Sequence, residues 1–295
     1  MRGIVEFDAS WNVDVVYKRE TSERVTVNWL LVTWLIYLAL ALFGSTIGSC
    51  LSVVIHRLSV GASVVSRVGA CPTCEVEIHS YDKAPILSWI LLRGKCRYCK
   101  EPISDRYPLI EALNALLWIG CYAYFGWSVE LIAFLYLTSA GLVLTMIDLA
   151  VHRLPNVIVL PSYLVLGGIY VVGAIIDGPW GGDWSQLLRA ALAGLSLYVF
   201  YFLIVLIYPR GMGFGDVKLA GVLGAALGWF GWGHLLVGSF AAFLLGGVLS
   251  IGLLLTGKAK RGTGIPFGPW MILGAGVGVL WGEQIFDSYL QLVGF

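Results

Sequence analysis

Charged side chains are scarce in this chain of 295 residues. Lys, Arg, Asp and Glu together make up 13% of it, hydrophobic residues make up 58%, and the mean hydropathy is +0.83. This balance excludes an ordinary soluble domain and predicts a protein that crosses the membrane several times. The net charge of +1 does not suggest a nucleic-acid partner. Residues 1–25 lack the apolar core of a cleavable signal peptide, so we expect the first spanning helix to insert and stay.

The chain also lacks the patterns of common nucleophilic hydrolases. Its four histidines are scattered and no G-x-S-x-G motif is present. The candidate catalytic groups are instead carboxylates at the ends of apolar runs. Asp148 ends the run that contains Thr145–Ile147, and Asp216 lies in the glycine-rich stretch Gly211–Leu219. An ionisable residue at such a depth is costly, and it is a functional-site hypothesis by default.

Apolar runs long enough to cross a bilayer set the expected architecture. A span needs about 20 residues. The sequence predicts an all-α polytopic membrane protein with about eight spanning helices and a small cytoplasmic zinc-binding insertion. The runs are 28–55, 108–126, 130–148, 156–176, 185–208, 217–232, 234–256 and 265–282. The expected division is an outer-side N-terminal segment (1–27), the first span (28–56), the zinc-binding domain (57–107) and a transmembrane domain that carries both aspartates (108–295).

Lys and Arg set the expected orientation. If the polar stretch after the first span is cytoplasmic, the inner loops carry fourteen basic residues and the outer side carries five, which is a positive-inside bias. Both termini would then face outward, and Asp148 and Asp216 would both lie at the cytoplasmic face. Arg189 belongs to the outer five, and we expect it to snorkel to the interface.

The one sizeable soluble stretch contains four cysteines. Cys71, Cys74, Cys96 and Cys99 form two C-x-x-C pairs, and the spacer between the pairs is slightly longer than the usual range for zinc ligands. A stretch of about 50 residues is marginal for a core of its own and needs such a staple. Two disulfides are the alternative, and a reducing cytosol disfavours them. Structural zinc is therefore the prediction.

Two carboxylates at one membrane face predict acid–base chemistry. One can activate water while the other protonates the leaving amine, because like charges a few ångströms apart cannot both ionise. For Asp216 alone, a helix N-terminus that favours an acid is a sufficient explanation. Gly213 and Gly215 would let an extended substrate approach, with Lys218 beside them. His152 and Arg153 could orient Asp148, meet the substrate or simply lie in a surface loop.

At these residues the sequence resembles the type IV prepilin peptidase family. Asp148–Asn156 and Gly213–Leu219 resemble the segments that carry the two catalytic aspartates, and the resemblance covers roughly residues 44 to 275. A lone G-x-G-D motif is weak, but together with the cysteine loop it is specific. The other matching segments are Phe43–Gly44, Gly48–Ser49, Val53–Ile55, Arg57–Leu58, Cys71–Cys74, Tyr81–Asp82, Pro85–Trp89, Arg93–Cys99 and Ile103–Glu111.

The resemblance implies a bifunctional enzyme of the cell inner membrane. It would remove the basic leader of type IV prepilins and type II secretion pseudopilins after a glycine, at the cytoplasmic face. It would then methylate the new N-terminus with S-adenosylmethionine as methyl donor. Ser52 stands where the family usually has Asn, and Ser59 where it usually has Pro. Both departures lie in the segment associated with methylation.

Other classes of protein remain as alternatives. An intramembrane protease of the signal-peptide-peptidase type also carries G-x-G-D. A transporter or proton channel would hold carboxylates near the midplane and needs no zinc module. A non-enzymatic assembly factor could use the zinc domain for docking, but would need no aspartate pair. The sequence names no particular prepilin and no oligomeric state.

Overall fold

The computed structural model describes residues 11–61, 71, 73–74, 76–77, 82, 84–176, 184–209, 211–257 and 266–294. Within these ranges the chain is all-helical, as the sequence predicted, and no regular strand is present. The expected outer loop 177–183 and the basic residues of 258–261 lie outside the described residues. The helices are α1 (Trp11–Ser59), α2 (Leu87–Leu91), α3 (Arg106–Phe125), α4 (Val129–Val151), α5 (Asn156–Ile175), α6 (Trp184–Ile207), α7 (Phe214–Phe230), α8 (Trp232–Leu255) and α9 (Gly268–Val293).

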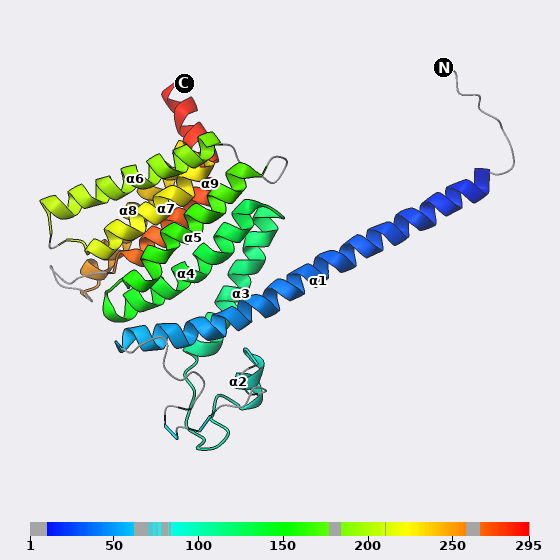
Figure 1. Ribbon diagram of the computed structural model, residues 1–295, viewed down its shortest axis with the longest axis horizontal. Helices are drawn as coiled ribbons and strands as arrows, with labels where there is room; N and C mark the ends of the chain where they lie inside the picture. The colour runs from blue at the N-terminus through cyan, green and yellow to red at the C-terminus, as the bar shows by residue number, and fades with distance from the viewer. Residues whose placement is uncertain are drawn as a thin grey trace.

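Six of the described helices have the length and composition to cross a membrane. They are the Leu31–Ser59 part of α1 together with α3, α4, α5, α6 and α8. The other two long helices are α7, with 17 residues, and α9, with 26 residues. The count of eight spans therefore stays a prediction. Figure 1 shows α4 to α9 gathered in one bundle, while α1 crosses its edge and projects beyond it.

Helix α7 lies at the centre of the bundle. Most of its side chains are buried, and many belong to the main core cluster. Because other helices surround α7, its buried residues occur all around the helix rather than on one face. Small residues allow this close packing: a Cβ on Gly228 would lie 2.2 Å from Ala193 Cβ of α6. The helix that carries Asp216 is thus fixed by packing on nearly every side.

The far end of α7 is held by polar contacts. Arg189 of α6 donates hydrogen bonds to the carbonyl oxygens of Gly228 (2.8 Å), Trp229 (2.6 Å) and Phe230 (3.2 Å). These carbonyls belong to the last turn, whose carbonyl oxygens have no N–H donor inside the helix. Arg189 does not snorkel away from the bundle as expected; it caps α7. The sequence could not show this because the cap depends on how α6 packs against α7.

Helices α1 and α3 form a separate close pair. A Cβ on Gly48 would lie 2.7 Å from Glu111 Cα, so only a glycine allows this approach. Asn114, which is fully buried, donates to the carbonyl of Gly44 at 2.7 Å. Ser139 of α4 donates to Asn114 Oδ1 at 2.9 Å and links the pair to the bundle. The glycines of the α1 motif therefore serve helix packing.

Candidate active site

Asp148 lies in the last turn of α4, and its side chain is 5% exposed. The helix ends because His152 adopts a left-handed conformation with φ 54°, and its N–H donates to the carbonyl of Asp148 at 2.9 Å. The carboxylate Oδ2 accepts a 3.0 Å hydrogen bond from the N–H of Gly268, the first residue of α9. Asp148 therefore sits at the positive end of the α9 dipole, which stabilises its charged form.

Asp216 lies in the first turn of α7 and is 9% exposed. Its Oδ2 accepts a 3.1 Å hydrogen bond from the N–H of Gly213, and its own N–H donates to the Gly213 carbonyl at 3.1 Å. This exchange closes the start of the helix. The capping role that the sequence suggested for Asp216 is therefore real. This cap uses only the Oδ2 atom of the carboxylate, so Oδ1 remains available for another interaction.

Leu154 brings the two aspartates together. It lies in the short connection between α4 and α5, and its side chain fills the space beside Gly215 and Gly268. A Cβ on Gly215 would lie 2.9 Å from Leu154 Cβ, and one on Gly268 would lie 3.2 Å from Leu154 Cδ2. A Cβ on Gly268 would also lie 2.8 Å from Asp148 Oδ2. Both glycines are needed because the backbones of α7 and α9 approach the same leucine.

The two carboxylates are close enough to act on one another electrostatically. Within the described part of the chain, neither one has a Lys or Arg partner, and neither Oδ1 atom accepts a hydrogen bond. Neighbouring like charges in a poorly solvated place disfavour ionisation of both groups at once. The two aspartates are therefore a candidate acid–base pair.

The remaining predicted residues surround this pair. Gly213 is the N-cap of α7, and Gly215 contacts Leu154. Lys218 does not reach either carboxylate; its Nζ donates to Asn156 Oδ1 at 2.9 Å. Asn156 is the first residue of α5, so this contact joins the segment Asp148–Asn156 to the segment Gly213–Leu219. His152 and Arg153 are exposed at the end of α4.

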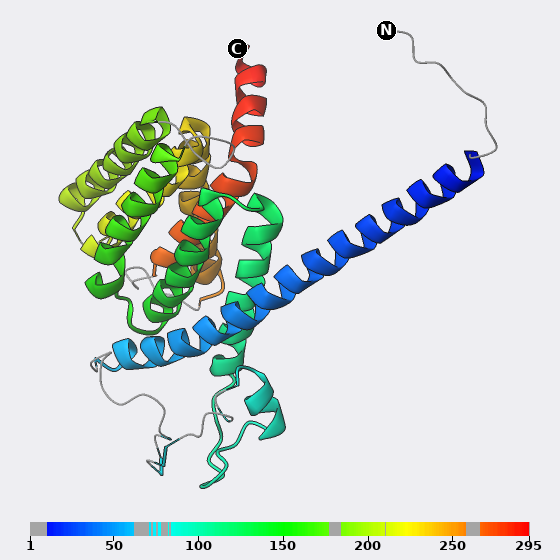
Figure 2. The ribbon, with the colours of Figure 1, turned by 45° about the vertical axis from the view of Figure 1, so that its right-hand side comes forward.

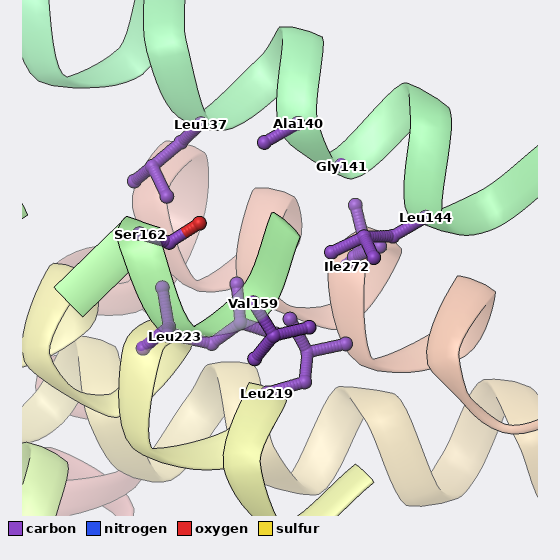
Figure 3. Close-up of a pocket in the computed structure, with 10 residues that line it drawn as sticks. Leu137, Ala140, Gly141, Leu144, Val159, Ser162, Leu219, Leu223 and Ile272 are labelled. Atoms are coloured by element: carbon purple, nitrogen blue, oxygen red, sulfur yellow. The ribbon is translucent and has the colours of Figure 1, made fainter. Parts of the chain in front are cut away.

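A small apolar cavity of about 30 Å³ lies about one helical turn from each aspartate, because Leu144 and Leu219 line it. Figure 3 shows its lining side chains. Its only polar side chain, Ser162, already donates to the Ile158 carbonyl and contacts the hydroxyl of Tyr136. The space suits about one water molecule, which would lack the polar partners it needs. The lining residues are Leu137, Ala140, Gly141, Leu144, Val159, Ser162, Leu219, Val222, Leu223 and Ile272.

Sequence analysis missed Leu154 and Gly268 as parts of the site. Gly268 is followed by Pro269 at the start of the last apolar run, which is a helix-start signal. That signal predicts where α9 begins, but it does not say which residue the helix N-terminus faces. Tyr201 of α6 was also missed; it is buried and close enough to Asp216 to interact with it electrostatically.

The four cysteines meet as predicted. One sulfur from each of Cys71, Cys74, Cys96 and Cys99 lies within 4.8 Å of the others, and the Sγ atoms of Cys71 and Cys99 are 3.8 Å apart. Four sulfurs bound to one zinc at 2.3 Å in a tetrahedron lie about 3.8 Å from one another. The residues present therefore fit a zinc ion.

A matching backbone hydrogen bond follows the first cysteine of each C-x-x-C pair. The Cys71 N–H donates to the Val76 carbonyl at 3.0 Å, and the Cys96 N–H donates to the Glu101 carbonyl at 2.8 Å, each across five residues. These bonds close two similar turns that present their thiols to one point. Hydrogen bonding from the Cys74 backbone lowers the pKa of Cys71 to about 6, which favours the thiolate that zinc binds. Zinc would hold the two turns together.

Two models of known protein families match successive parts of the chain. Residues 42–125 match the bacterial peptidase A24 N-terminal domain, and residues 115–251 match the type IV leader peptidase family. The chain is 36% identical to the prepilin leader peptidase/N-methyltransferase of Stutzerimonas stutzeri, with 84% of this chain and 91% of that protein covered. The chain belongs to the type IV leader peptidase family.

Other relatives of the same name agree. The protein of Pseudomonas aeruginosa is 36% identical over 86% of this chain and 93% of its own length, and that of Aeromonas hydrophila is 34% identical over 87% and 94%. No solved structure matches the chain significantly. As a member of the leader peptidase family, the chain is a membrane enzyme. Both aspartates lie inside the peptidase match, and all four cysteines lie inside the N-terminal match.

Proposed function

We propose that Asp148 and Asp216 hydrolyse the peptide bond between the basic leader and the mature part of type IV prepilins and type II secretion pseudopilins. The observation that carries this proposal is the meeting of two nearly buried carboxylates around Leu154, each bound by a helix-terminal N–H through one oxygen only. The names of the relatives support the class of substrate.

The chemistry follows from one shared proton. The ionised aspartate takes a proton from a water molecule, whose oxygen attacks the scissile carbonyl carbon. The protonated aspartate donates to the carbonyl oxygen as the tetrahedral intermediate forms. Collapse of the intermediate breaks the C–N bond, and the proton taken from water goes to the leaving amine. As the carbonyl group re-forms, a hydroxyl of the intermediate returns a proton to the other aspartate, so the pair again holds one proton.

Burial makes the pair effective. The apolar residues that line the cavity near the aspartates, together with the surrounding core, lower the local dielectric constant. A developing charge therefore interacts strongly with each carboxyl group. The N–H groups of Gly213 and Gly268 hold the two side chains in place. This preorganisation means that little rearrangement is needed when the substrate arrives.

The active site faces the cytoplasm in this proposal, and both termini lie outside the cell inner membrane. The contacts of Lys218 and Arg189 place them toward opposite ends of α7, which agrees with the inner and outer groups of basic residues. A reporter fused at Arg153 should give a cytoplasmic signal, and one fused at Gly181 should give an outer-side signal. A cytoplasmic signal at Gly181 would contradict the orientation.

The second activity we propose is N-methylation of the new terminal amine by S-adenosylmethionine, as the relatives' names and the resemblance imply. Ser52, which departs from the family pattern, is buried and donates to the Gly48 carbonyl of its own helix at 3.0 Å. Its hydroxyl proton is therefore used within α1.

Mass analysis of a co-expressed prepilin tests both activities. We expect the mature protein to begin directly after the leader glycine and to carry the mass of one added methyl group at its N-terminus. An uncleaved prepilin in the presence of well-folded enzyme would overturn the peptidase proposal. A correctly cleaved product without the methyl mass would overturn the methyltransferase proposal alone.

A further inference from the structure

The short helix α2 exposes one apolar face outside the bundle. Leu87, Ile90 and Leu91 are spaced as i, i+3 and i+4, so they lie on the same side of the turn. Their exposed fractions are 61%, 57% and 81%. The opposite side of the turn is anchored: the Trp89 indole donates to the Ile103 carbonyl at 3.2 Å and packs closely against Gly94. The apolar side chains are thus turned away from their own domain.

A hydrogen bond joins the start of α2 to the first turns of α3, which is a candidate spanning helix. The N–H of Ile86, directly before α2, donates to Glu111 Oε2 at 2.7 Å. Glu111 is the sixth residue of α3, which places it about 7.5 Å along a candidate spanning helix at 1.5 Å per residue. Interfacial helices lie about 5–10 Å into the boundary between headgroups and acyl chains. Figures 1 and 2 show α2 beside the N-terminal end of α3.

Three exposed basic residues follow α2 or begin α3. Arg93 and Lys95 follow α2 and are exposed, and Arg106 is exposed at the start of α3. The α2 helix itself carries no acidic residue. Basic side chains beside an apolar face are typical of segments that bind anionic phospholipids. A second copy of the chain fits less well, because a stable protein interface buries about 800 Å² on each partner, more than three side chains offer.

We propose that the face formed by Leu87, Ile90 and Leu91 inserts into the membrane interface, with Arg93, Lys95 and Arg106 at the anionic headgroups. The zinc-binding segment is then held by the bilayer as well as by Glu111, and cannot swing freely in the cytoplasm or the outer compartment. This inference does not depend on the chemistry of the aspartates or on which side of the membrane the segment occupies.

Photocrosslinking in the full chain tests the proposal. A benzophenone amino acid is placed at Leu91 or, as a matched control, at the exposed Glu101 beside the cysteine cluster, and the protein is reconstituted in nanodiscs of phosphatidylglycerol. We expect phospholipid adducts by mass spectrometry at position 91 and several-fold fewer at position 101. Since the same apolar probe is used at both sites, the difference reports position. Zinc content confirms that each variant is folded.

Two results would overturn the proposal. One is an adduct at position 91 mainly with a second copy of the chain, and the other is equal lipid labelling at both positions. Replacement of Arg93 and Lys95 together by Gln should reduce the lipid adduct at position 91 several-fold in phosphatidylglycerol and have little effect in phosphatidylcholine. An unchanged yield in phosphatidylglycerol would contradict the role of the basic residues.

Discussion

Replacing Asp148 or Asp216 by Asn should reduce cleavage of a purified prepilin by at least roughly 10³-fold. Asparagine keeps the shape of the side chain and an oxygen that can accept the N–H of Gly268 or Gly213. It cannot hold or take the proton that the reaction needs. The two variants therefore separate the structural role of each carboxylate, which Asn preserves, from its chemistry, which Asn removes.

The double variant should be hardly worse than either single one, because two residues that share one proton act as a unit. Glu130→Gln is the matched control. Glu130 is also a carboxylate hydrogen-bonded inside the bundle, accepting from the Trp229 indole at 2.8 Å, but it lies near the opposite end of α7. It should retain most of the activity. Substantial turnover by a well-folded Asp148→Asn or Asp216→Asn variant would remove that aspartate from the mechanism.

The sequence predicted the features that depend on composition and local spacing. Long apolar runs predicted eight spans, and six of the described helices have the length and composition of a membrane span. Paired C-x-x-C motifs predicted the cysteine cluster because each pair builds its own turn and only their meeting depends on the fold. Asp148 and Asp216 could be selected because burying an ionisable residue at the end of an apolar run is energetically unfavourable, so such a residue is a candidate functional residue.

The features that the sequence did not predict depend on contacts between distant segments. Asp148 and Gly268 are separated by 120 positions in the chain, and no local pattern links them. The sequence could not show that Arg189 caps α7, because its three acceptors are backbone carbonyls. Every residue has a backbone carbonyl, so no sequence pattern identifies these three. The apolar run that begins at residue 28 did not predict that α1 starts at Trp11, because residues 11–27 are too polar for a span.

Loss of zinc should unfold the segment between α1 and α3. Purified protein should carry about one zinc ion per chain, and Cys71→Ser or Cys96→Ser should lose it. The free energy of binding at structural zinc sites is about 10–16 kcal/mol, far more than a core of this size supplies. Limited proteolysis should therefore cut within residues 57–107 of these variants much faster than in the wild type, while the spanning helices stay protected.

Cys50→Ser is the matched control, since Cys50 is exposed on α1 and lies outside the cysteine cluster. It should keep its zinc and the wild-type proteolysis pattern. Chelation of the wild type should reproduce the effect of Cys96→Ser without any mutation, because the metal rather than the thiol side chain holds the two turns together. Wild-type protein that contains no zinc, with disulfides found among Cys71, Cys74, Cys96 and Cys99 by mass spectrometry, would show that oxidation rather than metal binding closes this segment.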